Sequence, residues 1–230
     1  MSAETNSRAI VILGGTGDQG LGLALRFAKA GRPVVIGSRK LERAVEAAEK
    51  VREAVPRADV VGLENVDAAP CGPIVIVSVP FEHTASTVKA IKPALVAGQI
   101  VVSMAVPLAA AIGDGAVRTV GIWQGSCAEL VESLVPPGVH VVSAFQNVSA
   151  HRLQHLEEEV DCDVVVSGAK EPRETVMGLC ALVPGLRALN GGPLANARIV
   201  EDITALMIGL NIRYKLPEGT GIRFTGLLES

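Results

Sequence analysis

A glycine-rich turn near the N-terminus joins an apolar strand to a helix. Residues 9–13 are apolar and mostly β-branched, which is typical of a buried strand, and Gly15, Gly17 and Gly20 then form the spacing G-x-G-x-x-G. Residues 21–28 continue with a helical pattern. In this motif Gly15 allows a sharp turn, Gly17 lets the backbone approach a pyrophosphate, and Gly20 lets the helix pack closely on its strand. The sequence therefore predicts a dinucleotide bound at a helix N-terminus, where unpaired N–H groups attract an anion.

The residues after the second predicted strand, 34–37, indicate which dinucleotide binds. Sites for NAD usually carry Asp or Glu about twenty residues past the glycine turn, where the carboxylate holds the ribose 2′-hydroxyl. Here the chain has Ser38, Arg39 and Lys40 instead. A hydroxyl followed by cations suits a 2′-phosphate, and Arg43, on the next predicted helix, adds a third cation. The pattern predicts NADP, and the alternative is a solvated basic start of a helix.

Strands and helices alternate as far as residue 146. Hydrophobic residues make up 49% of the chain and aromatic residues only 3%, so the core is aliphatic, as in parallel sheets covered by helices. We predict an α/β fold with a Rossmann-type, doubly wound, mostly parallel sheet in a domain of residues 1–146. The expected helices are 41–55, 82–91 and one starting with a capping box at Ser126, and the expected further strands are 60–63, 74–79, 100–103, 117–122 and 140–144.

Beyond residue 146 the pattern changes to helices separated by one or two strands. The expected helices are 148–159, 172–182 and 194–214, with a strand at 163–166. We interpret residues 147–230 as a smaller C-terminal α/β lobe that packs directly on the first domain. The last helix is apolar on more than one side, so it is either the core of this lobe or also part of a subunit interface. We expect a homo-oligomer, a dimer.

Composition and charge exclude several classes of partner. The net charge is −3 and the chain has no basic run, which argues against nucleic acid and against an anionic membrane. Polar residues and Pro107 interrupt the longest apolar region, 94–112, so no membrane span is expected. The N-terminus has no secretory pattern, and the four cysteines are too widely spaced for a disulfide framework. We predict buried or idle thiols, a cytoplasmic location and small-molecule partners.

The crevice outside the carboxyl ends of the strands is where ligands bind in such a sheet. The residues expected there are mostly apolar and include no nucleophile motif, no acid/base pair and no metal motif. A crevice of this kind suits direct hydride transfer without a catalytic side chain. His83 either contacts a ligand or is a solvent-exposed histidine at the start of a helix, and Trp123 either packs against a flat ring of a ligand or packs at a lobe boundary. His151 and His155 belong to a solvated helix face or, alternatively, to a metal site.

Five segments together resemble one family. Residues 13–20, 36–39, 123–126, 144–150 and 191–198 match, in this order, the NADPH-dependent coenzyme F420 reductases, also called F420-dependent NADP oxidoreductases. The last two segments are the most specific, and the likeness extends from residue 10 to residue 227. The resemblance implies a Rossmann domain, a small C-terminal lobe, and reversible hydride transfer between NADPH and the 5-deazaflavin ring of F420.

The resemblance also implies which residues hold the two coenzymes. The glycine turn, with Gly15, Thr16, Gly17, Asp18, Gln19 and Gly20, would hold the pyrophosphate, and Ser38, Arg39 and Arg43 the 2′-phosphate. Val79, Phe81, Val148 and Ala150 would line the nicotinamide, and the deazaflavin would lie against Met104, Val106, Pro107 and Asn147. Residues 81–83 differ among relatives, which argues against an essential role for His83. The alternatives are an NADP-dependent reductase of a small imine or ketone and a non-catalytic NADPH sensor.

Overall fold

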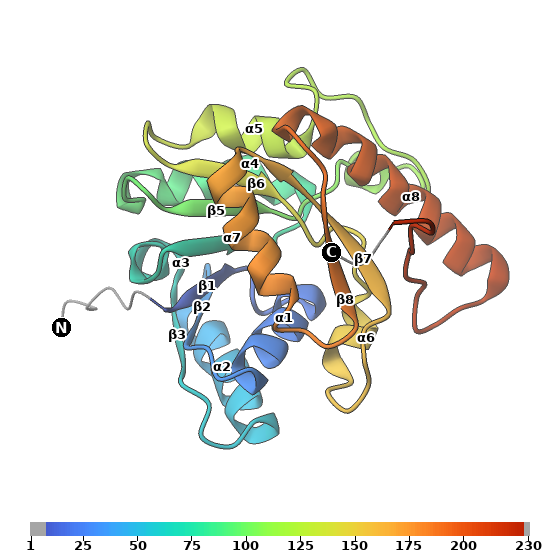
Figure 1. Ribbon diagram of the computed structural model, residues 1–230. Coiled ribbons are helices and arrows are strands. Elements are labelled where there is room, and N and C mark those ends of the chain that lie inside the picture. Colours follow the sequence, from blue (N-terminus) through green and yellow to red (C-terminus); the bar gives the residue numbers. More distant parts are fainter. Residues whose placement is uncertain (1–7, 228–230) are drawn as a thin grey trace.

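The strand before the glycine turn, β1 (Ile10–Leu13), lies inside an eight-stranded sheet. The structure is a computed structural model that describes residues 8–227 (Figure 1). The strand order is β3-β2-β1-β4-β5-β6-β7-β8, and its first six members have the order of a dinucleotide-binding sheet. The other strands are β2 (Val34–Ser38), β3 (Val60–Glu64), β4 (Ile74–Val77), β5 (Ile100–Ser103), β6 (His140–Ser143), β7 (Cys162–Gly168) and β8 (Leu186–Asn190).

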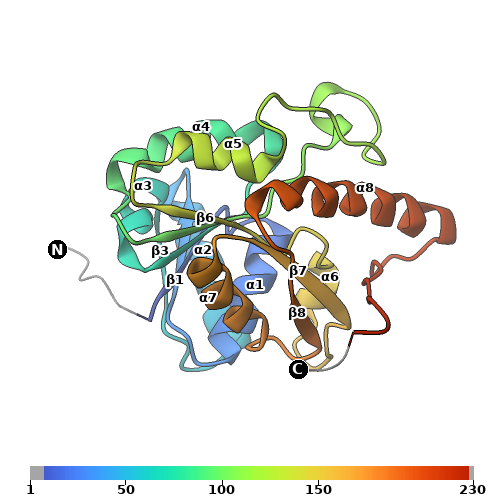
Figure 2. The same ribbon diagram turned by 45° about the horizontal axis from the view of Figure 1, so that its top comes forward.

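Helices cover both faces of this sheet (Figure 2). They are α1 (Asp18–Lys29), α2 (Leu41–Ala54), α3 (Asn65–Ala68), α4 (Phe81–Ile91), α5 (Cys127–Leu134), α6 (Ala150–Gln154), α7 (Lys170–Cys180) and α8 (Ala197–Tyr214). Alternate residues of β1 enter two separate apolar cores, because successive side chains of a strand point to opposite faces. Ile10 and Ile12 pack with Phe27 of α1, and Val11 and Leu13 pack with Ile91 of α4. The predicted doubly wound α/β fold is confirmed.

The C-terminal part of the chain extends the same sheet. Strand β7 pairs antiparallel with β6, and β8 pairs parallel with β7, whereas β1 to β6 are all parallel. The strand predicted at residues 163–166 is β7, which extends from Cys162 to Gly168 and is thus longer at both ends than the apolar pattern indicated. The division of the chain between residues 146 and 147, just before α6, stays a prediction.

The prediction of a strand at 117–122 is wrong. This segment is a loop, with one isolated bridge between Leu108 and Thr119. It folds back on the preceding turn, where the N–H of Ala109 donates to Arg118 and the N–H of Val120 donates to Pro107. These hydrogen bonds pair backbone groups of the segment with the preceding turn, so it does not need to join the sheet as a strand although it contains β-branched residues.

The helix predicted at 148–159 is also wrong in extent, because α6 has only five residues, Ala150–Gln154. The guanidinium of Arg26 donates to the carbonyl oxygens of Arg152, Leu153, His155 and Glu158. These are the carbonyls that a longer helix would have used internally, so a side chain from α1 ends α6. The predicted helix 194–214 begins as a 3₁₀ turn, Leu194–Asn196, and becomes α-helical at Ala197.

Other local predictions are confirmed. The Ser126 hydroxyl accepts a hydrogen bond from the N–H of Glu129, so the capping box starts α5 as expected. All four cysteines are buried and unpaired. Within the described chain, no helix combines the length and the apolar character that a membrane span requires.

Candidate functional site along the carboxyl ends of the strands

The turn between β1 and α1 depends on a glycine that the motif spacing did not single out. Gly14 has a φ of +77°, and a Cβ there would lie 2.6 Å from the carbonyl oxygen of Ser78. Gly15 is not among the glycines with positive φ, so the expectation that it makes the sharp turn is corrected. A Cβ on Gly20 would lie 2.8 Å from the Gly14 oxygen, which confirms that α1 packs tightly on the turn.

We expect Gly14→Ala and Gly17→Ala to separate the two roles of this loop. Gly14→Ala should lower the free energy of unfolding by about 2 kcal/mol or more, because alanine is strained at positive φ and meets Ser78. A Cβ on Gly17 makes only an ordinary contact, 3.5 Å from the Gly14 oxygen, so Gly17→Ala should keep its stability and bind NADPH more weakly. Urea unfolding and NADPH titration of both variants test this, and equal stability losses would contradict it.

A cavity of about 640 Å³ begins at this turn and extends toward β2 and α2. Thr16 and Gly17 line it at one end, and Ser38, Arg39 and Arg43 line it at the other. Lys40, Asn65, Val79, His83 and Thr87 complete much of its wall. None of the described residues that line this cavity is Asp or Glu, so it presents cationic groups without an opposing carboxylate. Such a surface is complementary to a phosphate.

A second cavity, of about 470 Å³, lies where β4 and β5 end. Val79 and Phe81 form one side of it, and Met104, Ala105 and Val106 form another. Most of the residues that line it are apolar, in agreement with the mostly apolar crevice that the sequence predicts. Thr204 and Ile208 of α8 also line it, and the sequence pattern gave no sign of this contact.

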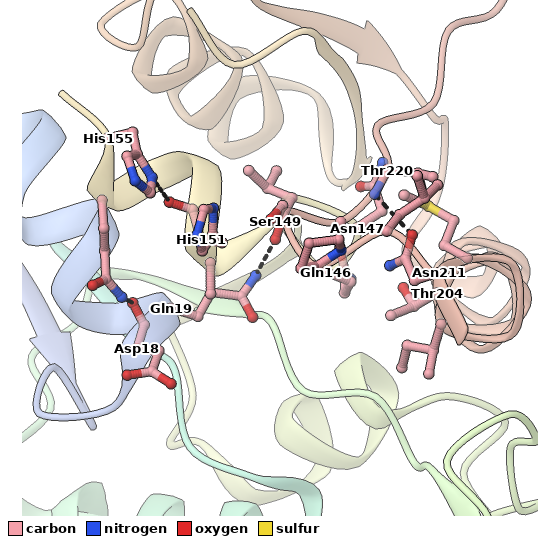
Figure 3. A pocket seen from close by; sticks show the side chains of 18 residues that line it. Asp18, Gln19, Gln146, Asn147, Ser149, His151, His155, Thr204, Asn211 and Thr220 are labelled. Carbon is pink, nitrogen blue, oxygen red and sulfur yellow. Dashed lines mark hydrogen bonds between the residues drawn. The ribbon is translucent and has the colours of Figure 1, made fainter. Parts of the chain in front are cut away.

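A third cavity, of about 640 Å³, separates α1 and α6 from α8 and the C-terminal segment. Figure 3 shows Gln19, His151 of α6 and His155 just after it on one side, with Thr204 and Asn211 on the other. Gln146, Asn147, Val148 and Ala150 line it as well. Asp18, Gln19, Gln146, Thr204 and Ile208 belong to both this cavity and the second, so the two adjoin.

The structure brings most of the predicted coenzyme-binding residues to these three cavities. Gly15, Gly20 and Pro107 are the exceptions, because they line none of them. The two glycines are needed for close packing, since a Cβ would lie 3.0 Å from the Ile12 carbonyl oxygen at Gly15 and 2.8 Å from the Gly14 oxygen at Gly20. The carbonyl oxygen of Pro107 accepts a hydrogen bond from the N–H of Val120 at 2.7 Å.

The side chain of Gln19 is used within the protein. Its Nε2 donates to the carbonyl oxygens of Phe145, at 2.9 Å, and of Val148, at 3.1 Å. Phe145 is fully buried, has a φ of +68°, and packs edge-on against Phe27. A bulky residue at positive φ is strained, so Gln19 and Phe27 together hold a turn that the backbone would otherwise avoid. This turn places residues 146–148 in the wall of the third cavity.

Two buried amides follow this turn. Nδ2 of Asn147 donates to the carbonyl oxygen of Asp163 at 2.9 Å, and Nε2 of Gln146 donates to the Ser143 hydroxyl. The amide oxygens of both residues have no hydrogen-bond partner among the described residues. Because unpaired buried acceptors are costly, these two oxygens favour a ligand that offers N–H donors.

Glu201 of α8 is a buried carboxylate that the sequence analysis did not identify. It is 1% exposed, and its two oxygens accept from the N–H groups of Cys127, at 2.9 Å, and Ala128, at 3.2 Å. Burial raises the pKa of Glu201 to about 7, against the opposing effect of these two hydrogen bonds. The contact fastens α8 to the first turn of α5 and so fixes the helix that carries Thr204 and Ile208.

His151 and His155 line the third cavity but form no metal site among the described residues, and Trp123 lies away from the cavities. The rings of His151 and His155 stack with centroids 4.2 Å apart, and Nδ1 of His155 lies 2.9 Å from the His151 carbonyl oxygen. No group of three or more metal-ligating side chains comes together in residues 8–227. Trp123 is 98% exposed and lines none of the three cavities, so the alternative of packing at a lobe boundary is wrong.

Comparisons with known proteins agree with this architecture. Residues 9–107 match the family described as NADP oxidoreductase, coenzyme F420-dependent. The F420-dependent NADP reductase of Methanocaldococcus jannaschii is 51% identical over 223 residues, which cover 95% of this chain and 98% of the relative. The enzyme of the same name from Methanothermobacter thermautotrophicus is 44% identical, with 96% of each chain covered.

Solved structures share the fold. A putative F420-dependent NADP reductase from Arthrobacter sp. FB24 superposes with a TM-score of 0.77 and covers 95% of this chain and 100% of its own, at 21% identity. The hypothetical protein SMa0349 of Sinorhizobium meliloti superposes with a TM-score of 0.65 at 25% identity, covering 84% of this chain and 88% of its own. The 51% and 44% identity to the two reductases over nearly the whole chain shows that the chain belongs to the family of F420-dependent NADP reductases.

Proposed function

We propose that this protein catalyses reversible hydride transfer between NADP(H) and coenzyme F420. The observation that carries the proposal is the row of three adjoining cavities at the carboxyl ends of the strands, cationic at one end and apolar in the middle. A dinucleotide and a second planar coenzyme both have room in such a cleft. Full-length identity to enzymes named F420-dependent NADP reductases supports the same assignment.

The cationic cavity fits the adenosine half of NADPH. Ser38, Arg39 and Arg43 hold the 2′-phosphate in this proposal, since Arg forms paired charge-assisted hydrogen bonds with phosphate. The pyrophosphate lies at the N-terminus of α1, where Gly17 has no side chain to keep a phosphate away from the backbone. The N–H groups of the first turn of α1 have no partner within the helix, so they are available to the phosphate. Thr16 and Asp18 contribute with Gln19 to this phosphate site. Gln19 does so through its backbone, because its side-chain amide nitrogen is already bonded to Phe145 and Val148.

The apolar cavity fits the two reacting rings. In this proposal Val79 and Phe81 of the apolar cavity contact the nicotinamide, together with Val148 and Ala150 of the adjoining third cavity. Met104 and Val106, with Asn147 of the third cavity, contact the deazaflavin, and Pro107 supports this wall from behind, since it lines none of the cavities. The unpaired amide oxygens of Gln146 and Asn147 are suited to N–H donors such as those of a carboxamide or a deazaflavin ring.

The coenzymes supply the hydride chemistry, and the protein aligns them and excludes water. None of the described residues that line the apolar cavity is His, Lys, Arg or Cys, and its carboxylates are Asp18 and Glu82. We therefore assign no acid or base to the reaction. The Glu201 contact and the strained turn at Phe145 keep the walls of the cavity at a fixed separation, which direct transfer between stacked rings requires.

The first test is to mix the purified protein with NADPH and F420 and follow the loss of the visible absorbance of the deazaflavin. We expect rapid bleaching with NADPH and little with NADH. Binding of NADPH without bleaching would overturn the proposal and direct attention to small imines and ketones. Tight NADPH binding without turnover of any acceptor would indicate a sensor.

We expect Arg39→Ala to weaken NADPH binding by about 1.5–3 kcal/mol, the value of a hydrogen bond to a charged group, and to leave NADH binding nearly unchanged. Titration of both cofactors against wild type and variant measures the difference. Arg57→Ala, a cation outside the three cavities, is the matched control and should change neither affinity. Equal losses for NADPH and NADH in Arg39→Ala would rule out contact with the 2′-phosphate.

We further propose that the protein is a homodimer in the cytoplasm, with residues 1–146 and 147–230 as its two domains. Support for the dimer comes from α8, where Ile199, Leu206 and Ile212 are each more than half exposed. A soluble protein rarely leaves several large apolar side chains of one helix in water. Light scattering during size exclusion tests the oligomeric state, and a monomer mass would refute it.

A further inference from the structure

His83 lies in the first turn of α4, at the end of β4. The structure places it in the wall of the cationic cavity, together with Ser38, Arg39 and Arg43. The two sets of residues come from different parts of the chain, because Ser38 ends β2, Arg39 follows it in the loop and Arg43 lies in α2, whereas His83 lies in α4. Strand β1 and its glycine turn lie between them in the sheet. A ligand that enters the cavity therefore has His83 on one wall and the arginines on another.

The charged side chains that line the cationic cavity with His83 are all cations, and Glu82, its neighbour in α4, lines the adjoining apolar cavity instead. The other charged groups that line the cavity are Arg39, Lys40 and Arg43, and no Asp or Glu is among the described residues of its wall. The ring of His83 has no hydrogen-bond partner in the described part of the chain, although its main chain is bonded to Pro80 and Ser86. An anion that enters the cavity would therefore be the first group of opposite charge on this wall that the half-buried ring of His83 meets.

We propose that His83 is a specificity-determining residue which, as an imidazolium, binds the 2′-phosphate of NADPH and makes the preference for NADPH over NADH depend on pH. The inference rests on the proposed function only in taking NADPH as the ligand of this cavity. The imidazolium adds a charge-assisted hydrogen bond to those of Arg39 and Arg43. NADH carries a hydroxyl at the same place and gains no such bond.

The direction of the pH dependence follows from the groups involved. A phosphate monoester loses its second proton near about pH 6, and an unperturbed imidazole titrates near about pH 6.5. Bound phosphate favours the charged ring, so imidazolium and dianion coexist in the complex around neutral pH. At higher pH an imidazolium is deprotonated, whereas guanidinium and ammonium groups remain charged. Affinity for NADPH should fall over this range and affinity for NADH should not.

The test measures the dissociation constants of NADPH and NADH by fluorescence titration between about pH 6.5 and 8.5. In the wild type we expect NADPH binding to weaken by about threefold to tenfold across the range, the loss of part of one charge-assisted hydrogen bond. His83→Gln, which keeps a donor but no charge, should bind NADPH with a weak, pH-independent affinity. His83→Lys should bind it tightly at every pH tested, because the lysine charge persists.

Controls separate this role from others. His140→Gln removes an exposed histidine outside the three cavities and should leave the NADPH profile unchanged. If His83→Gln weakens the binding of NADPH and of NADH equally, the proposal is overturned in favour of a contact with the adenine that both cofactors share. A pH dependence that persists in His83→Gln would overturn it as well. Because binding is measured without F420, absence of hydride transfer would leave this test intact.

Discussion

Replacing Arg26 with methionine should lower the free energy of unfolding by about 3–5 kcal/mol, as expected when a buried, fully hydrogen-bonded charge is removed. Arg26 is 2% exposed. Its three nitrogens donate to the carbonyl oxygens of Arg152, Leu153, His155 and Glu158 at 2.6–2.8 Å. Methionine fills a similar volume but leaves these four acceptors without their donor. Urea unfolding with an unchanged m-value measures the loss.

Two further variants define the origin of this effect. Arg26→Lys keeps the charge, but a lysine cannot donate to four carbonyl oxygens in one plane. Its free energy of unfolding should therefore lie between those of the wild type and Arg26→Met. Arg32→Met is the matched control, because this arginine also donates only to a backbone carbonyl, that of Arg8, at a more exposed site. We expect it to cost less than about 1 kcal/mol. A similarly small loss in Arg26→Met would refute the role of Arg26 in holding α6 on α1.

Replacing Asp163 with asparagine should also cost about 3–5 kcal/mol, because two arginines would face an amide in place of a carboxylate. Asp163 is fully buried and accepts four hydrogen bonds, from Nε and Nη2 of Arg187, from Nη1 of Arg223 and from the N–H of Phe224. The last two fasten the C-terminal segment, whose residues 216–220 form a wall of the third cavity. Urea unfolding measures the loss, and limited proteolysis should detect release of this segment.

The stability contributed by Asp163 depends on pH in a defined direction. Burial acts to raise the pKa of this carboxyl, but the hydrogen bonds from Arg187, Phe224 and Arg223 outweigh it and lower the pKa to about 2. The folded state thus favours the carboxylate, so its contribution is complete above the ordinary value of 3.8 and is lost as the pH falls toward about 2. The difference in unfolding free energy between wild type and Asp163→Asn should shrink over that interval.

Asp161→Asn is the control for this prediction. Asp161 also pairs with Arg223, at 2.6 Å, but its side chain is 76% exposed. Exposed pairs contribute about 1 kcal/mol or less, so this variant should remain near wild-type stability. If both substitutions cost the same small amount, the buried cluster is not what holds the C-terminal segment.

Local sequence patterns were sufficient for the first half of the molecule. Strands at residues 10–13, 34–38 and 100–103 consist mostly of consecutive β-branched or aliphatic residues, with Gly37, Ser38 and Ser103 only at their carboxyl ends. Such runs form buried parallel strands because both faces of the sheet must be apolar. The cationic cavity was equally predictable, because Ser38, Arg39 and Arg43 follow β2 at short range. Chain direction alone brings them to the edge where β1 ends.

Contacts between distant segments decided the remainder. The length of α6 depends on Arg26, more than 120 positions earlier in the chain, and the turn at Phe145 depends on Gln19 in the same way. Likewise, nothing local to 117–122 distinguishes a strand from a loop that pairs with residues 107–109. These outcomes reflect which carbonyl meets which donor after folding, and periodicity carries no such information.

The parallel strands β1 to β6, the glycine turn and the preference for NADP follow from residues that act through their own backbone geometry or charge within a short span. The extension of the sheet by β7 and β8, the turn at Gly14, the attachment of α8 through Glu201 and the approach of His83 to the arginines became visible only in the folded molecule. Each of these depends on distances between elements, which burial and hydrogen bonding set when the layers pack.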